Sequence, residues 1–441
     1  MSTLTNKEEY KLSLPTAILI NINIMLGAGI FINTPELAKR AGLLGGFNYF
    51  VVGLLMLPLI LCIAQLLKLY PSGGFYAFAR HQISPFAGFL SGWSYFTSKL
   101  ASSMLMIHVS MSLVKQIIPL FAEVNVFTMD TFIVCLFVLL NMLNIKAGSM
   151  IQKMFISFKT IPIFFAIFTC LFLLNGQNFS TANLIWEGIP NSLPLVIYAV
   201  IGFEAAASMS SKIQNAERNA PLAVLISFGI VVFIAFLYQF LFYGAIGSQL
   251  TQVADYRGVF PALFDTLFAG NEFLISRGIA ILHLAIASST LGAAYGILFS
   301  NVWNLHVLAQ NGHLFFSSFF TSLNKHFIPY ACVIIEGLFC LLYLWVSQGI
   351  SVPLQQIGAL GCVIAYAFSV WGLLLGQKSN PKVTLHRWIP WLGLFNCAIL
   401  LTACIYSFFI KGMSSLIIYS ILIVLGISMY VMQNRANKKL S

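Results

Sequence analysis

Charged residues are scarce in this sequence: Asp, Glu, Lys and Arg make up only 8% of its 441 residues. A soluble domain carries about 25%, so the deficit excludes an ordinary water-soluble globular protein. Hydrophobic residues reach 59% and run from end to end, which excludes disordered and low-complexity classes. The class that remains is a multi-spanning membrane protein. A helix needs about 20 apolar residues to cross a bilayer, so the chain has room for about a dozen crossings.

Motifs of common enzymatic and metal chemistry are also missing. The eight cysteines lie inside apolar stretches, without a CxxC pair or the spacing of metal ligands, so we expect neither disulfides nor zinc. No GxxxxGK[ST] nucleotide cradle is present, which argues against a built-in ATPase. No Ser/His/Asp or His/Glu arrangement supports a membrane enzyme. We therefore expect no enzyme activity, no metal and no cofactor.

The sequence contains twelve long apolar runs. They lie near 15–33, 46–69, 85–113, 127–145, 154–175, 191–211, 222–247, 273–300, 327–347, 351–376, 388–410 and 413–432. Helices are expected because every backbone polar group must be satisfied within lipid. The sequence thus predicts an all-α membrane protein with 12 transmembrane helices, forming a single domain over 1–441.

The net charge of +11 is better explained by topology than by a nucleic-acid partner, because the basic residues are spread thinly over short loops. With twelve spans, fifteen Lys and Arg residues fall in one set of loops and tails and six in the other, while Lys99 and Lys159 lie inside spans. An excess of Lys and Arg marks cytoplasmic loops. We expect a multi-pass protein of the cell membrane (plasma or inner) with both termini cytoplasmic and no nucleic-acid partner.

Two of the runs are interrupted midway. The first reads LININIMLGAGIF, with Gly27 and Gly29 flanking Ala28, and the sixth reads VIYAVIGFEAAASMSS, with Gly202 shortly before Glu204. Glycine costs about 1 kcal/mol in a helix, and a carboxylate inside a span about 2.5–3.5 kcal/mol. Glycines can simply allow close helix packing. Interruptions at corresponding positions of two five-helix halves, however, are typical of a transporter site built on discontinuous helices.

Several motifs in order resemble the amino acid–polyamine–organocation (APC) superfamily of transporters. GAGIFINTPELAKRAGLLGG is similar to its first helix, YPSGGFYAFARHQISPFAGFLSGW to its second-to-third helix link, and GFEAAASMSSKIQNAERNAP to its sixth helix and following loop. The resemblance implies a LeuT-type fold. That fold has an inverted 5+5 repeat, with repeat one at about 15–175 and repeat two at about 191–376, discontinuous helices 1 and 6, and here extra helices at about 388–432.

The resemblance also implies how a substrate is held. Unwound first-helix amides bind the substrate carboxylate in the family, and the matching positions are Ala28, Gly29 and Ile30. Free N–H groups at a helix N-terminus make a reasonable anion site. Unwound sixth-helix carbonyls hold the ammonium, and the matching positions are Ile201, Gly202 and Phe203. Tyr198, one turn before the break, matches an aromatic gate, with a packing aromatic as the alternative.

Two ionisable residues match positions that the family links to coupling. Glu204 corresponds to the acid near the sixth-helix break, which is either proton-linked or a structural acid bonded to freed backbone groups. Lys159 matches a fifth-helix lysine of sodium-independent relatives, whose ammonium lies where sodium binds in sodium-coupled members of the fold. Alternatively, Lys159 reaches along its span to the cytoplasmic surface.

Lys99 departs from the family, which usually has a neutral residue facing the substrate cavity there. It either favours acidic substrates, or pairs with Glu204 or Glu336, or reaches toward water. Asn23 stands where the family often has Gly, and Gln310 and Asn311 stand where it usually has a charged pair.

Three other polar residues fall inside the predicted spans, namely His108, His283 and Glu336. Intramembrane ionisable residues are functional hypotheses by default. The family assigns these three no role, and satisfied interior hydrogen bonds are the simpler interpretation.

The resemblance implies a secondary transporter of amino acids that works by alternating access. It would be sodium-independent, as a proton-coupled symporter or a substrate exchanger, with protons, an amino acid and the lipid bilayer as its partners. The alternative is a transporter of polyamines or other small amines and metabolites on the same fold. A channel or a non-transporting membrane receptor is a more distant alternative. Which amino acid is carried and the oligomeric state stay open.

Overall fold

The computed structural model describes residues 10–268, 270–347, 351–377, 380–411 and 413–440. Within these ranges the regular secondary structure is helical, apart from two isolated bridges that pair Leu12 with Ile213 and Gly42 with Leu184. The prediction of an all-α protein is therefore confirmed for the described chain.

Among the described residues, nine helices are long and apolar enough to cross a membrane. They are α3 (Leu44–Leu69), α5 (Pro85–Ile117), α7 (Ile145–Phe172), α10 (Ala216–Ile246), α13 (Glu272–Gln310), α15 (Tyr330–Ser347), α16 (Ser351–Gly376), α17 (Trp388–Lys411) and α18 (Ser414–Leu440). The bent pair α1 (Leu14–Met25) and α2 (Gly29–Ala41) makes a tenth candidate. Two shorter apolar helices, α6 (Val126–Asn141) and α8 (Gly188–Val200), cover the remaining predicted runs. Every run predicted from the sequence is thus helical, while the count of twelve crossings stays a prediction.

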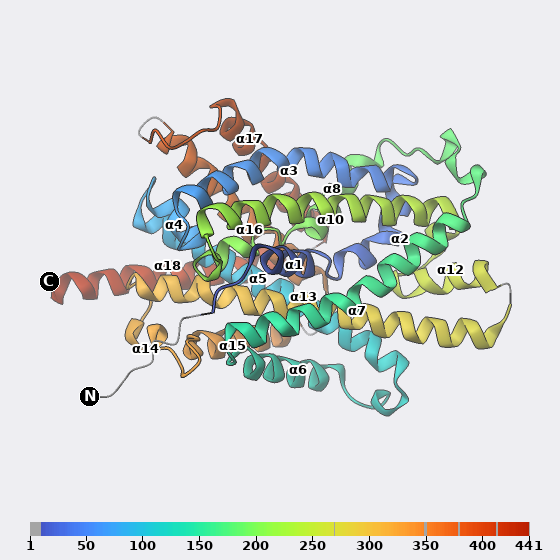
Figure 1. The fold of residues 1–441 in the computed structure, drawn as a ribbon, viewed down its shortest axis with the longest axis horizontal. Coiled ribbons are helices and arrows are strands. Elements are labelled where there is room, and N and C mark those ends of the chain that lie inside the picture. Colours follow the sequence, from blue (N-terminus) through green and yellow to red (C-terminus); the bar gives the residue numbers. More distant parts are fainter. Residues whose placement is uncertain (1–9, 269, 348–350, 378–379, 412, 441) are drawn as a thin grey trace.

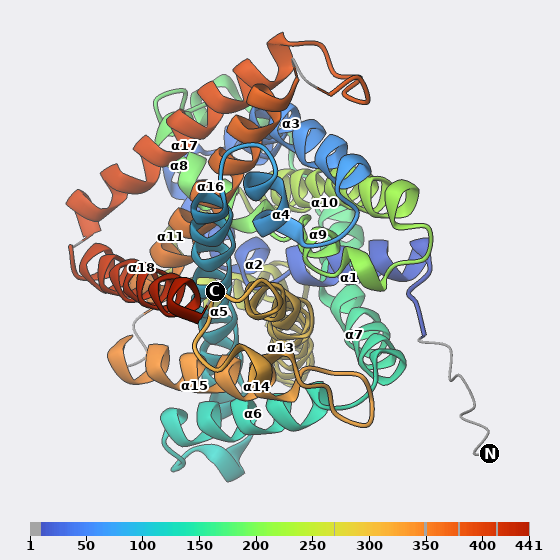
Figure 2. The ribbon, with the colours of Figure 1, turned by 90° about the vertical axis from the view of Figure 1, so that its left-hand side faces the viewer.

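The long helices run along one direction of the molecule (Figure 1). The short helices α4 (Gly74–Arg80) and α14 (Ser317–Thr321) lie at one end, here called the α4 end, and α12 (Val259–Phe268) lies at the other. Figure 2 looks onto the α4 end and shows α5 in the middle of the bundle, with α6 and α17 on opposite sides of it. The centre of the bundle is therefore built from helices far apart in the sequence.

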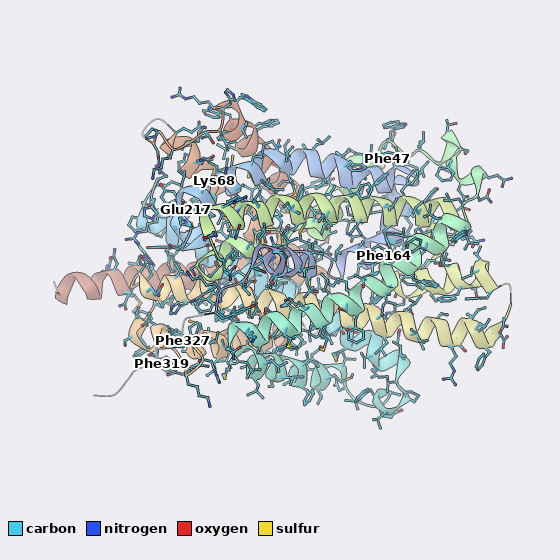
Figure 3. All side chains as sticks on the ribbon, in the orientation of Figure 1. Phe47, Lys68, Phe164, Glu217, Phe319 and Phe327 are labelled. Atoms are coloured by element: carbon cyan, nitrogen blue, oxygen red, sulfur yellow. The ribbon has the colours of Figure 1, made fainter. Side chains whose placement is uncertain are left out.

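Apolar side chains cover the sides of this bundle. Phe47 and Phe164 are 41% and 46% exposed and project from its sides, whereas exposed Lys68 and Glu217 lie near the α4 end (Figure 3). Water would disfavour such large exposed rings, but lipid accommodates them. The surface is that of a multi-pass membrane protein.

Both interruptions predicted from the sequence are breaks in the structure. The first separates α1 from α2 at residues 26–28, where the chain bends by 46°. The second leaves residues 201–204 in turns between α8 and the single-turn helix α9 (Ala205–Ser208). The prediction of discontinuous helices at these two positions is confirmed.

The two breaks touch each other, and glycine makes that contact possible. A Cβ on Gly29 would lie 2.8 Å from the Cα of Ala199, and a Cβ on Gly202 would lie 2.8 Å from Cγ2 of Ile24. Gly202 also has φ +131°, a backbone conformation that residues with a side chain rarely adopt. Close packing and broken helices are therefore two results of the same glycines.

Asn21, on α1, ties the first broken helix to the second. Its side-chain amide donates to the Phe203 carbonyl at 2.6 Å and to the Ser227 hydroxyl at 3.1 Å. Its side-chain oxygen accepts from the Ala206 N–H at 3.0 Å. Asn21 thus satisfies backbone groups that the α8–α9 break leaves without helical partners. No local sequence pattern predicts this role.

We predict that Asn21→Leu destabilises the protein by about 1–3 kcal/mol, because the Phe203 carbonyl and the Ala206 N–H would be buried without partners. Thermal unfolding of the purified protein measures the loss. The matched control is Asn191→Leu, which removes an exposed amide bonded to the Glu187 carbonyl and should change stability by less than about 0.5 kcal/mol. Equal losses in both variants would contradict the role of Asn21.

Candidate functional site

The start of α2 presents a group of free backbone donors. The first amides of this segment to bond are those of Phe31 and Ile32, which donate to the Ala28 carbonyl at 3.1 and 2.9 Å. Within the described chain, the N–H groups of residues 27–30 form no hydrogen bond. They carry the positive end of the helix dipole. An anion placed beside them would satisfy several donors at once.

The end of α8 presents the complementary group of acceptors. The last helical bond joins the Ile201 N–H to the Ile197 carbonyl at 3.1 Å. Within the described chain, the carbonyls of residues 198–201 accept no hydrogen bond. The Gly202 carbonyl accepts from Ala205, and the Phe203 carbonyl accepts from Asn21. A cation would therefore find its unoccupied acceptors on residues 198–201. Of the three positions that the family resemblance indicates, only the Ile201 carbonyl is among them.

The donors and the acceptors lie together inside the protein. Gly29, among the donors, packs against Ala199, among the acceptors. Ala28 is fully buried, and Ile30, Tyr198 and Ile201 are at most 8% exposed. The Tyr198 hydroxyl has no hydrogen-bond partner among the described residues. The arrangement offers a positive and a negative helix end to one small zwitterion.

Glu204 holds the second break together. One of its oxygens accepts from the Gly202 N–H at 2.9 Å. The other accepts from the Tyr95 hydroxyl at 3.1 Å and from the Lys99 ammonium at 3.2 Å. The Lys99 and Glu204 side chains are 3% and 0% exposed. Of the predicted alternatives for Lys99, the structure shows the pairing with Glu204.

Lys159 holds the first break. It is fully buried, and its ammonium donates to the Asn23 carbonyl near the end of α1. From α13, the Ser289 hydroxyl donates to the Leu26 carbonyl at 3.3 Å. Two helices thus supply donors to carbonyls that lose their partners where α1 stops. The alternative in which Lys159 reaches the membrane surface is not the arrangement in the structure.

The Asn23 side chain is bound as well. Its amide donates to the Gln152 side chain and, at 2.9 Å, to the Gly292 carbonyl. Asn23 therefore connects α1 to α7 and α13 at the level of the break. The sequence marks Asn23 only as a departure from the family and does not predict this role.

The remaining ionisable residues of the spans lie apart from the breaks. His108 pairs through Nδ1 with buried Asp130 at 2.7 Å, a partner that sequence analysis missed. His283 is buried on α13, and neither carboxylate oxygen of buried Glu336 forms a hydrogen bond within the described residues. In the same part of the chain, no group of three His, Cys, Asp or Glu residues comes together as a metal site.

We predict that Lys99→Met destabilises the protein by about 3–5 kcal/mol, because it leaves the Glu204 carboxylate buried without a cation. Adding Glu204→Gln to that variant should recover most of the loss, since no charge then remains unpaired. Thermal unfolding of the single and double variants forms a double-mutant cycle that isolates the pair. A double variant no more stable than Lys99→Met would contradict a direct ion pair.

Known proteins match this chain over most of its length. The amino acid permease family matches residues 12–430. The b(0,+)-type amino acid transporter 1 of Mus musculus is 21% identical over 356 residues, which cover 77% of this chain and 71% of the relative. The Homo sapiens and Oryctolagus cuniculus transporters of that name are 21% and 22% identical over 394 residues, covering 86% of this chain and 78% of each relative. The resemblance noted from the sequence is confirmed: the chain belongs to the amino acid permease family of the APC superfamily, whose members are multi-pass membrane transporters rather than enzymes.

Proposed function

We propose that this permease is a secondary transporter that moves amino acids by alternating access on a LeuT-type fold. The observation that carries the proposal is the contact between two broken helices, one presenting free N–H groups and the other free carbonyls. An α-amino acid bears one anionic and one cationic group on the same carbon, so it complements both helix ends at once. In this proposal α17 and α18 follow two inverted five-helix repeats and complete twelve spans.

Substrate binding then follows from the main chain. The carboxylate binds the amides of Ala28, Gly29 and Ile30, and the ammonium binds carbonyls before and around Gly202. Tyr198 lies on the last turn before the second break, so its ring is the natural cover over a bound substrate. The main chain binds the α-carboxylate and the ammonium, which all amino acids share. The surrounding side chains would select among different amino acids.

Lys99 contributes to this site through Glu204. The ion pair fixes the carboxylate that also accepts from the Gly202 N–H, so it keeps the second break open. A direct contact between Lys99 and an acidic substrate would require this pair to open. Lys99 would thus link the charge of the substrate to the geometry of the second break.

Lys159 is proposed to couple protons to the movement of α1. When charged, its ammonium satisfies the Asn23 carbonyl; when neutral, it holds that carbonyl less strongly. Gain and loss of one proton would therefore tighten and release the first broken helix. The ammonium also occupies the Asn23 carbonyl, which a metal cation could otherwise use as a ligand; this supports sodium-independent transport. Proton symport and substrate exchange are both compatible with this coupling.

We propose that the α4 end faces the cytoplasm, because the loops predicted to hold fifteen of the Lys and Arg residues include those around Arg80 and Lys325. Both termini would then be cytoplasmic, as the positive-inside rule requires. The matched relatives carry "amino acid transporter" in their names, and the same class of cargo is proposed here.

Competition for uptake tests the substrate class. In proteoliposomes that contain the full-length protein, unlabelled amino acids should inhibit uptake of the transported amino acid. The matching decarboxylated amines should inhibit about ten- to a hundredfold more weakly, since they lack the group that binds the α2 amides. Saturation and counterflow should accompany uptake. Equal inhibition by the amines would favour the amine-transporter alternative, and non-saturating flux would favour a channel.

Replacement of Lys159 tests the coupling. Lys159→Met should abolish uptake or remove its dependence on pH, because the Asn23 carbonyl loses its switchable donor. Lys153→Met is the control: it removes an exposed lysine from the same helix and should leave uptake unchanged. A folded Lys159→Met protein with the pH-dependent uptake of the wild type would rule out the coupling role.

A further inference from the structure

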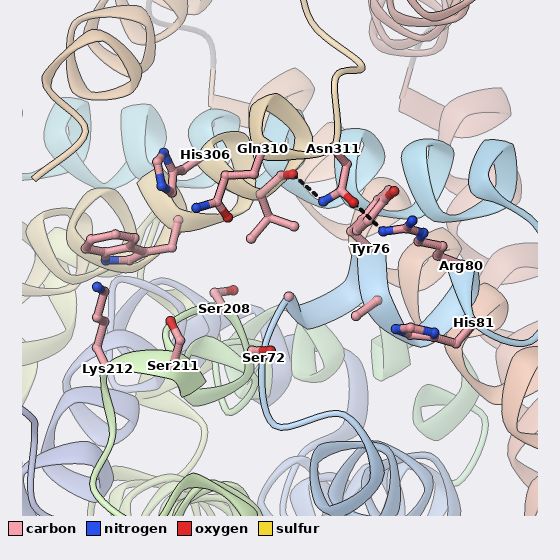
Figure 4. Close-up of a pocket in the computed structure, with 14 residues that line it drawn as sticks. Ser72, Tyr76, Arg80, His81, Ser208, Ser211, Lys212, His306, Gln310 and Asn311 are labelled. Carbon is pink, nitrogen blue, oxygen red and sulfur yellow. Dashed lines mark hydrogen bonds between the residues drawn. The ribbon is translucent and has the colours of Figure 1, made fainter. Parts of the chain in front are cut away.

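A cavity at the α4 end lies apart from the residues proposed to bind the transported amino acid. It measures about 370 Å³ and lies between α4, the last turns of α13 and the short helix η4 (Ser210–Lys212). The described residues that line it include the cations Arg80 and Lys212 and no Asp or Glu. Figure 4 shows these two cations at opposite ends of the cavity. The described wall thus carries a positive charge at each end.

Arg80 marks one end of the cavity. Its guanidinium donates to the Asn311 side-chain oxygen and lies 5.5 Å from the centroid of the Tyr76 ring. Both partners are neutral, so they do not compensate its charge. A guanidinium has five N–H donors, which leaves most of them for a ligand. Burial and the Arg80 charge lower the pKa of His81, on the same wall, so this imidazole is neutral near pH 7.

Lys212 marks the other end. Its ammonium lies 4.3 Å from the centroid of the Trp303 ring, whose face attracts a cation without neutralising it. Trp303 is 5% exposed, and its indole N–H donates to no other group in the described chain. This end of the wall therefore combines a cation with a ring that carries an unpaired donor.

Polar groups line the sides between the two cations. Ser72 and Ser211 are exposed, and neither hydroxyl forms a hydrogen bond within the described chain. Figure 4 places them on one side of the cavity, with Gln310 and Asn311 on the other. Hydroxyls and side-chain amides can donate to the oxygens of an anion. The lining as a whole suits an elongated polar molecule with an anionic group at each end.

We propose that this cavity binds a small organic dianion, such as a short dicarboxylate, with one anionic group at Arg80 and the other at Lys212. Hydrogen bonds between ionised partners are about twice as strong as those between neutral ones. A monocarboxylate makes such bonds at one end only, and so does an inorganic anion too small to span the cavity. The spacing of the two cations therefore selects for two anionic groups on one molecule.

A ligand in this cavity would hold α4 and the second broken helix together. Gly74, at the start of α4, packs against α9: a Cβ on Gly74 would lie 3.3 Å from the Ala207 carbonyl oxygen. Ser208, the last residue of α9, lines the cavity one helical turn after Glu204. A dianion that bridges α4 and η4 would therefore fix α9 in place and slow transport. Only this last consequence rests on the proposed transport function.

Isothermal titration calorimetry on the full-length protein in lipid nanodiscs tests the site without any transport. The probes are succinate and butyrate, which have equally long carbon chains but two carboxylates and one. Succinate should bind about ten- to a hundredfold more tightly at pH 7, because butyrate lacks one set of charged hydrogen bonds. Arg80→Gln and Lys212→Gln should each reduce this preference to less than about threefold. The control Lys325→Gln, which removes an exposed lysine outside the cavity, should keep it.

A wild type that binds succinate no more tightly than butyrate would overturn the proposal. A preference that survives in Arg80→Gln or in Lys212→Gln would also overturn it, and so would an equal loss in Lys325→Gln, which would indicate attraction to surface charge in general. If one variant fails to fold, the other carries the same comparison. None of these outcomes depends on amino acid uptake, so failure here is distinguishable from failure of the proposed function.

Discussion

The structure depends on main-chain polar groups that are released inside the bundle and must be satisfied there. Lipid offers no water to the N–H and C=O groups of a broken helix. Part of the need is met by side chains of the protein: Asn21 bonds across to the second break, while Lys159 and Ser289 bond to the end of α1. Among the groups at the breaks that the described residues leave unpaired are the N–H groups of residues 27–30 and the carbonyls of residues 198–201. These free N–H groups and carbonyls complement the carboxylate and the ammonium of an amino acid.

Three ionisable residues of the interior follow the same logic. Lys99 and Glu204 are buried as a pair, and Glu204 also accepts from the backbone at Gly202. Lys159 is buried against a carbonyl at the opposite break. Each of these three is therefore placed where it offsets a break, which explains why a chain with so few charged residues retains them inside its spans. A charge is costly in this setting unless a partner or a proton neutralises it.

Sequence alone was sufficient for the parts set by local chemistry. Apolar runs located the helices, and Gly27, Gly29 and Gly202 located the breaks, because hydropathy and backbone freedom are local properties. The pairing of Lys99 was one of several alternatives, since the sequence does not say which acid lies opposite.

Other contacts could not be predicted because they join distant segments. Asn21 and Phe203 are separated by 182 positions, and an asparagine inside an apolar run has no local pattern that identifies its partner. For the same reason the sequence does not show that the carbonyls of Gly202 and Phe203 are already bonded, which leaves Ile201 as the one predicted carbonyl without a partner among the described residues.

The most direct test is an experimental structure of the full-length protein with its transported amino acid bound. The account predicts the carboxylate within hydrogen-bond distance of the N–H groups of residues 27–30. It predicts the ammonium against carbonyls of the segment that ends α8, with the ion pair of Lys99 and Glu204 still in place for a substrate without an acidic side chain. A substrate bound elsewhere, or one held only by side chains while both breaks are closed, would contradict it.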